Sequence, residues 1–209
     1  MQHYAGQDLA KRRDYSTFVI IRVEEPEDGE PISRVVGVKQ WPHVDYKQII
    51  EDTALLYLKY RWRMLGIDRS TVGDAVMEEY EAKGIPVDGV LFTAQSKHDM
   101  VQFMLMLLQQ KRLRLPRKGV EELKAQIVEQ ERIFSPSGIV KYEHPEKRHD
   151  DQFWALCLAL HVAKETLVDR EPNPIVYSSA NSLNARWPEL SRPGIRILSE
   201  ASTRDVQGW

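Results

Sequence analysis

The strongest constraint on the fold is a change in hydrophobic period near residue 45. Before it, segments 15–24 and 32–41 are rich in β-branched and aromatic residues, and the Pro- and Gly-containing turn 25–31 separates them. This pattern predicts two strands joined by a short turn. Residues 3–10 carry a weaker strand signal. We therefore expect an antiparallel meander of three strands at the start of the chain.

After residue 45 the apolar residues recur at helical spacing over 45–63, and strands then alternate with helices. Three antiparallel strands followed by this alternation predict an α/β fold with a mixed sheet and helices on both faces. The other predicted elements are a strand over 64–67, a helix over 71–83, a strand over 87–93, a helix over 96–110, an extended piece over 112–116, a helix over 118–131, a hairpin or loop over 133–143 and a helix over about 150–167.

Length and charge bound the function. The 209 residues suit one domain with a tail, and we expect a domain over 1–170 and a tail over 171–209 that packs on it or is partly mobile. The formal net charge of −2 excludes a global basic field, so any nucleic-acid contact must come from a local patch.

The single cysteine, Cys157, excludes an internal disulfide and a cysteine-based zinc cluster. It lies in the apolar run 153–160, which predicts a buried helix position rather than a nucleophile. No apolar stretch approaches the roughly 18 residues of a membrane span. The polar N-terminus has no signal-peptide pattern, so we expect a cytoplasmic protein.

Four acidic residues lie where predicted elements begin or end. Asp8 lies in the first strand, Asp68 follows the fourth, and Asp150 and Asp151 open the last long helix. If the first and fourth strands are neighbours, these carboxylates converge at one end of the sheet. Repulsion makes such a cluster unfavourable without cations, and Mg²⁺ or Mn²⁺ would remove that penalty. Two such ions about 3.5–4 Å apart can support phosphodiester hydrolysis.

Each residue also has a purely structural interpretation. Asp68 could lie near a helix N-cap, although Ser70 or Thr71 is the better cap candidate and would leave Asp68 for another role. Asp150 and Asp151 could only offset the macrodipole of their helix. A purely structural role explains Asp8 least well, because strands are depleted in Asp and an unpaired buried carboxylate is unfavourable.

The chain resembles the nuclease domain of phage and viral terminase large subunits, an RNase H-like fold, over roughly residues 4–165. Four stretches, taken in order, carry the resemblance: 6–10 with 14–17 (GQDLA, DYST), 66–73 (GIDRSTVG), 92–97 with 111–116 (FTAQSK, KRLRLP), and 149–151 before 155–159 (HDD, ALCLA).

This resemblance implies an endonuclease that cuts concatemeric viral DNA during genome packaging. It implies Asp8, Asp68 and one of Asp150 or Asp151 as metal ligands, with two Mg²⁺ or Mn²⁺ ions. Asp14 could help to bind a metal or could be a turn residue. Lys97 would face phosphate or transition-state charge, unless it is a solvated lysine, and His149 either supports a metal ligand from behind or is a loop residue. The candidate DNA-binding cations are Lys11, Arg12, Arg13, Arg69 and Lys97, of which the first three could equally be a solvated turn.

The resemblance also implies double-stranded DNA, an ATPase motor, a portal and a small terminase subunit as partners. The sequence has no Gly-x-x-x-x-Gly-Lys-Ser/Thr phosphate loop, so we expect an excised or a separate nuclease. Two alternatives stay open. One is another RNase H-like nuclease, of the Holliday-junction resolvase or ribonuclease H type. The other is an inactive module of this fold that docks to a protein.

Overall fold

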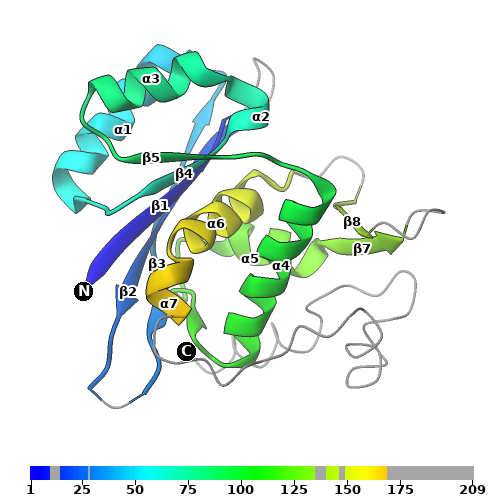
Figure 1. Ribbon diagram of the computed structural model, residues 1–209. Helices are drawn as coiled ribbons and strands as arrows, with labels where there is room; N and C mark the ends of the chain where they lie inside the picture. Colours follow the sequence, from blue (N-terminus) through cyan, green and yellow to red (C-terminus); the bar gives the residue numbers. More distant parts are fainter. Residues whose placement is uncertain (10–14, 28, 135–139, 146–148, 169–209) are drawn as a thin grey trace.

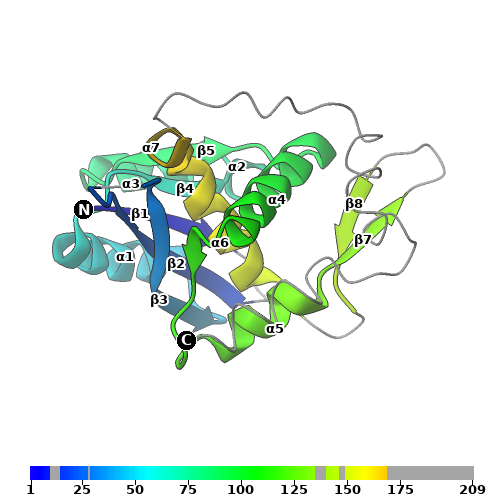
Figure 2. The ribbon, with the colours of Figure 1, turned by 90° about the horizontal axis from the view of Figure 1, so that it is seen from below.

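The computed structural model describes residues 1–9, 15–27, 29–134, 140–145 and 149–168. It contains a mixed sheet of six strands with helices on both faces, as the sequence predicts (Figures 1 and 2). The strand order is β5-β4-β1-β2-β3-β6. These strands are β1 (Gln2–Asp8), β2 (Tyr15–Glu24), β3 (Ile32–Pro42), β4 (Leu65–Asp68), β5 (Val87–Val90) and β6 (Leu113–Arg114).

The first three strands form the expected antiparallel meander. The first and fourth strands are neighbours and run parallel, with Gln7 opposite Ile67. Because each strand continues one residue further, Asp8 and Asp68 both lie at the carboxyl end of their strand, on the same edge of the sheet.

Two hydrophobic clusters fill the two sides of the sheet. One side is covered by α4 (Ala94–Gln109), α5 (Glu121–Glu129) and α6 (Asp151–Val162), and α7 (Lys164–Val168) follows α6. The other side is covered by α1 (Tyr46–Tyr60) and α3 (Asp74–Ala82), which the short helix α2 (Arg69–Val72) precedes. A separate hairpin of β7 (Glu131–Phe134) and β8 (Val140–Glu143) projects beyond α4 and α5 (Figure 2).

Helix α6 lies directly on β1 and β4 because glycines occupy the contact positions. A Cβ atom at Gly6 would lie 2.0 Å from the Ala155 carbonyl oxygen and 2.3 Å from the Ala159 nitrogen. At Gly66 a Cβ atom would lie 2.9 Å from the Leu158 carbonyl oxygen. Only glycine permits such a close approach of helix backbone to strand. The N-terminal end of α6 is therefore held at the edge where Asp8 and Asp68 lie.

Helix α6 is buried on almost every side, since it lies between the sheet and helices α4 and α5. Residues 152–160 are all buried, and Cys157 among them is fully enclosed, as predicted. Burial raises the pKa of the Cys157 thiol well above its usual value, which does not favour a nucleophile. Within the described residues, none of the helices combines the length and the apolar character needed to cross a bilayer.

Two predicted helices are each divided in the structure. The helix expected over 71–83 becomes α2 and α3, because Gly73 between them adopts a positive φ of 71°. The helix expected to about residue 167 ends as α6 at Val162, and α7 follows. The expected tail, 171–209, lies outside the described residues.

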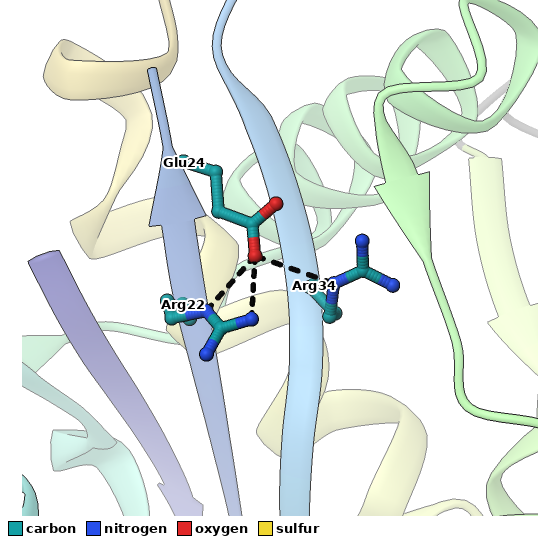
Figure 3. Close-up of polar contacts among 3 residues, drawn as sticks. All are labelled: Arg22, Glu24 and Arg34. Carbon is teal, nitrogen blue, oxygen red and sulfur yellow. Dashed lines mark hydrogen bonds and ion pairs between the residues drawn. The ribbon is translucent and has the colours of Figure 1, made fainter. Parts of the chain in front are cut away.

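The edge of the sheet opposite Asp8 carries a different polar group. There Glu24 Oε1 accepts hydrogen bonds from Arg22 Nε at 2.9 Å and Nη2 at 2.6 Å, and from Arg34 Nε at 3.4 Å (Figure 3). Arg22 is paired with His3, near the start of β1. These ion pairs join β2 to β3 far from the end of β1.

Candidate active site

The four acidic residues singled out in the sequence come from three elements that meet at one edge of the sheet. Asp8 ends β1, Asp68 ends β4, Asp150 is the N-cap of α6 and Asp151 is its first residue. Lys97 lies in the first turns of α4, which packs against α6.

The charges of the other three acids and of Lys97 all act on Asp8. Burial raises the pKa of Asp8 to about 8, and the negative charges of Asp151, Asp150 and Asp68 contribute in that order, whereas Lys97 acts in the opposite direction. Removal from water and like charge both disfavour a carboxylate. The acidic residues predicted from the sequence therefore interact electrostatically at Asp8, and Lys97 partly offsets their charge there.

Asp68 is nearly enclosed, with 6% of its surface exposed, and it is itself the N-cap of α2. Its Oδ1 accepts a hydrogen bond from the Ser70 backbone N–H at 2.9 Å. The prediction that Ser70 or Thr71 would be the cap was wrong. The Ser70 hydroxyl oxygen instead accepts from the Phe92 backbone N–H at 2.9 Å, which joins α2 to the chain after β5.

Asp150 is held by two neighbours. Its Oδ2 accepts a hydrogen bond from Trp154 Nε1 at 2.7 Å. Its Oδ1 lies 3.7 Å from His144 Nε2, a contact that is an ion pair only when the imidazole is protonated. Residues four apart in a helix lie on the same face, so Trp154 reaches the cap residue one turn before it.

Lys97 lies between two aromatic rings. Its ammonium is 4.4 Å from the centroid of the Trp154 ring and 4.9 Å from that of Phe92. Such cation–π contacts place an ammonium without neutralising it. Because Trp154 also binds Asp150, one side chain contacts both a cation and an anion of the cluster.

The remaining candidates lie at different places. Arg69 is exposed and pairs with Asp74, Nη2 to Oδ1 at 2.7 Å, which offsets its charge. His149 packs edge-to-face on Tyr15, with ring centroids 5.5 Å apart. The predicted residues Lys11, Arg12, Arg13 and Asp14 lie outside the described residues.

Three further residues at this edge, Trp154, Phe92 and Tyr46, were not predicted from the sequence. Tyr46 begins α1, and burial followed by the charge of Asp8 raises its pKa, which places it near the cluster. The spacing of Asp150 and Trp154 was the available signal for the indole contact. No local pattern pointed to Phe92, because its partner Lys97 belongs to the next element.

The donor types at this edge fit a hard divalent cation, which prefers carboxylate oxygens. Among the residues that the structure describes, however, no group of three or more His, Cys, Asp or Glu side chains is arranged to hold a metal ion as it stands. Asp68 Oδ1 accepts from the Ser70 backbone N–H and Asp150 Oδ2 accepts from the Trp154 indole, so one oxygen of each carboxylate is held by a hydrogen bond.

Comparison with solved structures identifies the same architecture. The large terminase nuclease of thermophilic phage G20c superposes with a TM-score of 0.63 at 19% identity, covering 77% of this chain and 81% of that one. That nuclease is also known with bound magnesium. The HK97 bacteriophage large terminase superposes with a TM-score of 0.61 at 18% identity, covering 78% of this chain and 39% of that one.

These superpositions confirm the predicted architecture of a mixed sheet with helices on both faces. No match to this chain was found among the curated proteins. The family model of the terminase RNase H-like domain matches residues 5–163. The match includes all three elements that bring the acidic residues together. The chain therefore belongs to the terminase RNase H-like domain family.

Proposed function

We propose that this chain is a divalent-metal-dependent endodeoxyribonuclease domain that cuts duplex viral DNA during genome packaging. The observation that carries the proposal is the meeting of Asp8, Asp68, Asp150 and Asp151 at one sheet edge, where burial and their mutual repulsion raise the pKa of Asp8 to about 8. A cluster that is so unfavourable without cations is typical of metal-dependent phosphodiester hydrolysis. Membership of the terminase RNase H-like domain family supports the same activity.

Asp8, Asp68 and one or both of Asp150 and Asp151 would hold Mg²⁺ or Mn²⁺, two ions in our proposal. The magnesium-bound form of the G20c nuclease supports a divalent ion. When bound, such ions polarise the phosphate and lower the pKa of water. Asp14 is a further candidate ligand.

The chain's own side chains contribute orientation and charge. Hydrogen bonds from Ser70 and Trp154 set the orientations of the Asp68 and Asp150 carboxylates, so a metal ion would meet each carboxylate in a defined orientation. Lys97, seated between two rings at the same edge, would face a phosphate oxygen and offset the charge that develops on it.

DNA would be bound by local cations that flank this edge, namely Lys11, Arg12, Arg13, Arg69 and Lys97. Within a packaging machine the domain would act with an ATPase motor, a portal and a small terminase subunit. We propose residues 1–170 as the nuclease domain and 171–209 as a tail, and a cytoplasmic location.

The test is nicking of supercoiled plasmid by the wild type and by Asp68→Asn, each with EDTA, Mg²⁺ or Mn²⁺. We expect cutting by the wild type only with a divalent ion. Asp68→Asn keeps the shape of the side chain and removes its charge, so it should lower cutting by about 100-fold or more, since even partners of a ligand contribute about 10–100-fold.

Asp88→Asn is the matched control. Asp88 is an exposed strand aspartate opposite Gly66, away from the carboxyl end of β4, and its substitution should leave cutting unchanged. Full activity of Asp68→Asn, or of the wild type in EDTA, would exclude the mechanism. Failure of the wild type to bind metal or to cut would favour the docking module. Preference for a four-way junction or an RNA–DNA hybrid would favour the other RNase H-like enzymes.

A further inference from the structure

Trp154 contacts two charged groups at the acidic edge, although it lies in the apolar segment 153–160 and only 3% of its surface is exposed. Its indole N–H donates to Asp150 Oδ2 at 2.7 Å. Its ring lies under the Lys97 ammonium at 4.4 Å. The same side chain therefore contacts the acidic cluster and its neighbouring cation.

The surroundings leave Trp154 little freedom to move. Its ring packs edge-to-face on Phe153, with centroids 5.0 Å apart, and at an angle on Phe92, at 5.4 Å. Its backbone N–H donates to the Asp150 carbonyl at 3.0 Å, so the two residues also share a helical turn. A buried donor held in this way keeps its direction, and the carboxylate that accepts from it keeps a corresponding orientation.

A hydrogen bond from an indole occupies one oxygen of a carboxylate and leaves the other available. Carboxylates that bind metals are themselves commonly hydrogen-bonded by residues behind them, which fixes their orientation and raises their affinity. Asp150 has this arrangement: Trp154 contacts Oδ2, whereas the neighbour of Oδ1 is the half-exposed His144 at 3.7 Å.

We propose that Trp154 is a positioning residue that orients the Asp150 carboxylate for divalent-metal binding and seats Lys97 beside it. The inference rests on the proposed metal-dependent nuclease function, and it deepens that function by assigning Asp150, through its Oδ1, to the metal site. Trp154 acts through these two side chains and contacts neither metal nor DNA.

The variant Trp154→Phe tests the hydrogen bond separately from the ring. Phenylalanine keeps an aromatic face for Lys97, which also retains Phe92, and removes the indole N–H together with the five-membered ring that carries it; the Trp41→Phe control loses the same atoms. We expect the Mn²⁺ or Mg²⁺ concentration for half-maximal nicking to rise about 10–100-fold, with the rate at saturating metal much less affected. Calorimetric titration of Mn²⁺ without DNA should show the same decrease in affinity.

The chain offers a closely matched control in Trp41→Phe. The Trp41 indole also donates to an aspartate at 2.7 Å, namely Asp52 Oδ2, and Trp41 is 4% exposed. It belongs to the hydrophobic cluster on the opposite side of the sheet. Removal of this hydrogen bond should lower stability to a similar extent and leave metal affinity unchanged.

A double-mutant cycle with Asp150→Asn identifies the residue through which Trp154 acts. If the indole acts through Asp150, Trp154→Phe should cause no further decrease in Mn²⁺ affinity in the Asp150→Asn background. Equal decreases in both backgrounds would mean that Trp154 affects the site by another route, and the inference would be overturned.

A measurement on the wild type covers the case in which the variant does not fold. The five tryptophans provide separate indole N–H signals in nuclear magnetic resonance. Addition of Mg²⁺ should shift the Trp154 indole signal and leave that of Trp41 in place. If the wild type binds no metal, the proposed function fails. If it binds metal while Trp154→Phe has wild-type affinity, or while the Trp154 signal does not move, only the present inference fails.

Discussion

At the acidic edge of the sheet, Asp8 has a strongly raised carboxyl pKa. Burial and three neighbouring carboxylates raise its pKa from 3.8 to about 8. A folded-state pKa above that of the unfolded chain means that its stabilising contribution is complete below about pH 4 and is lost as the pH rises through about 8. Without metal, the stability of the fold therefore decreases between about pH 4 and pH 8, because the unfolded chain releases a proton that Asp8 retains in the folded protein.

The first prediction concerns Asp8→Asn in EDTA. Asparagine cannot ionise, so we expect the variant to melt at a higher temperature than the wild type above about pH 8, by about 2 °C or more if at least 1 kcal/mol is recovered. The difference should shrink towards about pH 5. Calorimetric melts across this pH range measure it, with Asp88→Asn as the control. Parallel pH profiles of wild type and Asp8→Asn would contradict the prediction.

Helix α6 is the element that assembles the site, because it carries Asp150, Asp151 and Trp154 and packs on β1 and β4. Its close approach depends on Gly6 and Gly66. The contacts at Gly6 involve backbone atoms of Ala155 and Ala159, which cannot rotate away as a side chain can. The distance between the carboxylates of the strands and those of the helix is therefore set by the absence of a Cβ atom.

The second prediction is that Gly6→Ala displaces α6. A contact of 2.0 Å with a carbonyl oxygen cannot be tolerated, so we expect the free energy of unfolding to fall by about 3 kcal/mol or more. The melting temperature should fall by about 6 °C or more, since 1 kcal/mol corresponds to about 2–4 °C for a chain of this size. Metal affinity should fall as well.

Gly37→Ala is the control for this substitution. Its Cβ would meet only the Ile20 Cγ2 atom at 3.2 Å, a side-chain neighbour that can adjust. Its melting temperature should therefore fall much less, and its metal affinity should be unchanged. If Gly6→Ala were as stable as Gly37→Ala, the proposed role of the glycine contact would be wrong.

At the scale of the whole molecule, the net charge of −2 restricts how DNA can be bound. Lys97 lies at the acidic edge, Arg69 is offset by Asp74, and Lys11, Arg12 and Arg13 follow β1 in the sequence. A small number of phosphate contacts predicts weak binding that decreases with salt, by about 0.9 log units per log unit of salt for each neutralised phosphate.

The third prediction concerns the triple variant Lys11→Ala, Arg12→Ala and Arg13→Ala. Its affinity for duplex DNA should fall, and the slope of log affinity against log salt should become shallower by about 0.9 for each phosphate that is no longer neutralised. A triple alanine variant at Lys59, Arg63 and Lys83 has the same net charge and removes cations at or beside the ends of α1 and α3. Fluorescence anisotropy at several salt concentrations compares them. Equal slopes in the two variants would place the DNA contact elsewhere.

The sequence by itself determined the order of the helices and strands, and it placed the acidic residues near the ends of two strands and at the start of the last long helix. Its strand and helix periods are local properties, so the meander and the alternation that follows could be predicted without tertiary contacts. The division of the helix at Gly73 was missed, because an apolar pattern continues across a single residue of positive φ. The cap on α2 was also assigned wrongly, since Asp68, Ser70 and Thr71 are all competent caps by type.

The tertiary structure decided which of these residues meet and how they are oriented. The parallel pairing of β1 with β4 places Asp8 beside Asp68, and the glycine contacts bring α6 onto both strands. The contact of Lys97 with Trp154 joins helices α4 and α6, which are far apart in the chain, and Phe92 in the loop before α4 completes the seat of the ammonium. Such contacts depend on packing between distant segments, and no local period records them. The elevated pKa of Asp8 arises from the same packing, because it requires burial and three carboxylates from other elements at once.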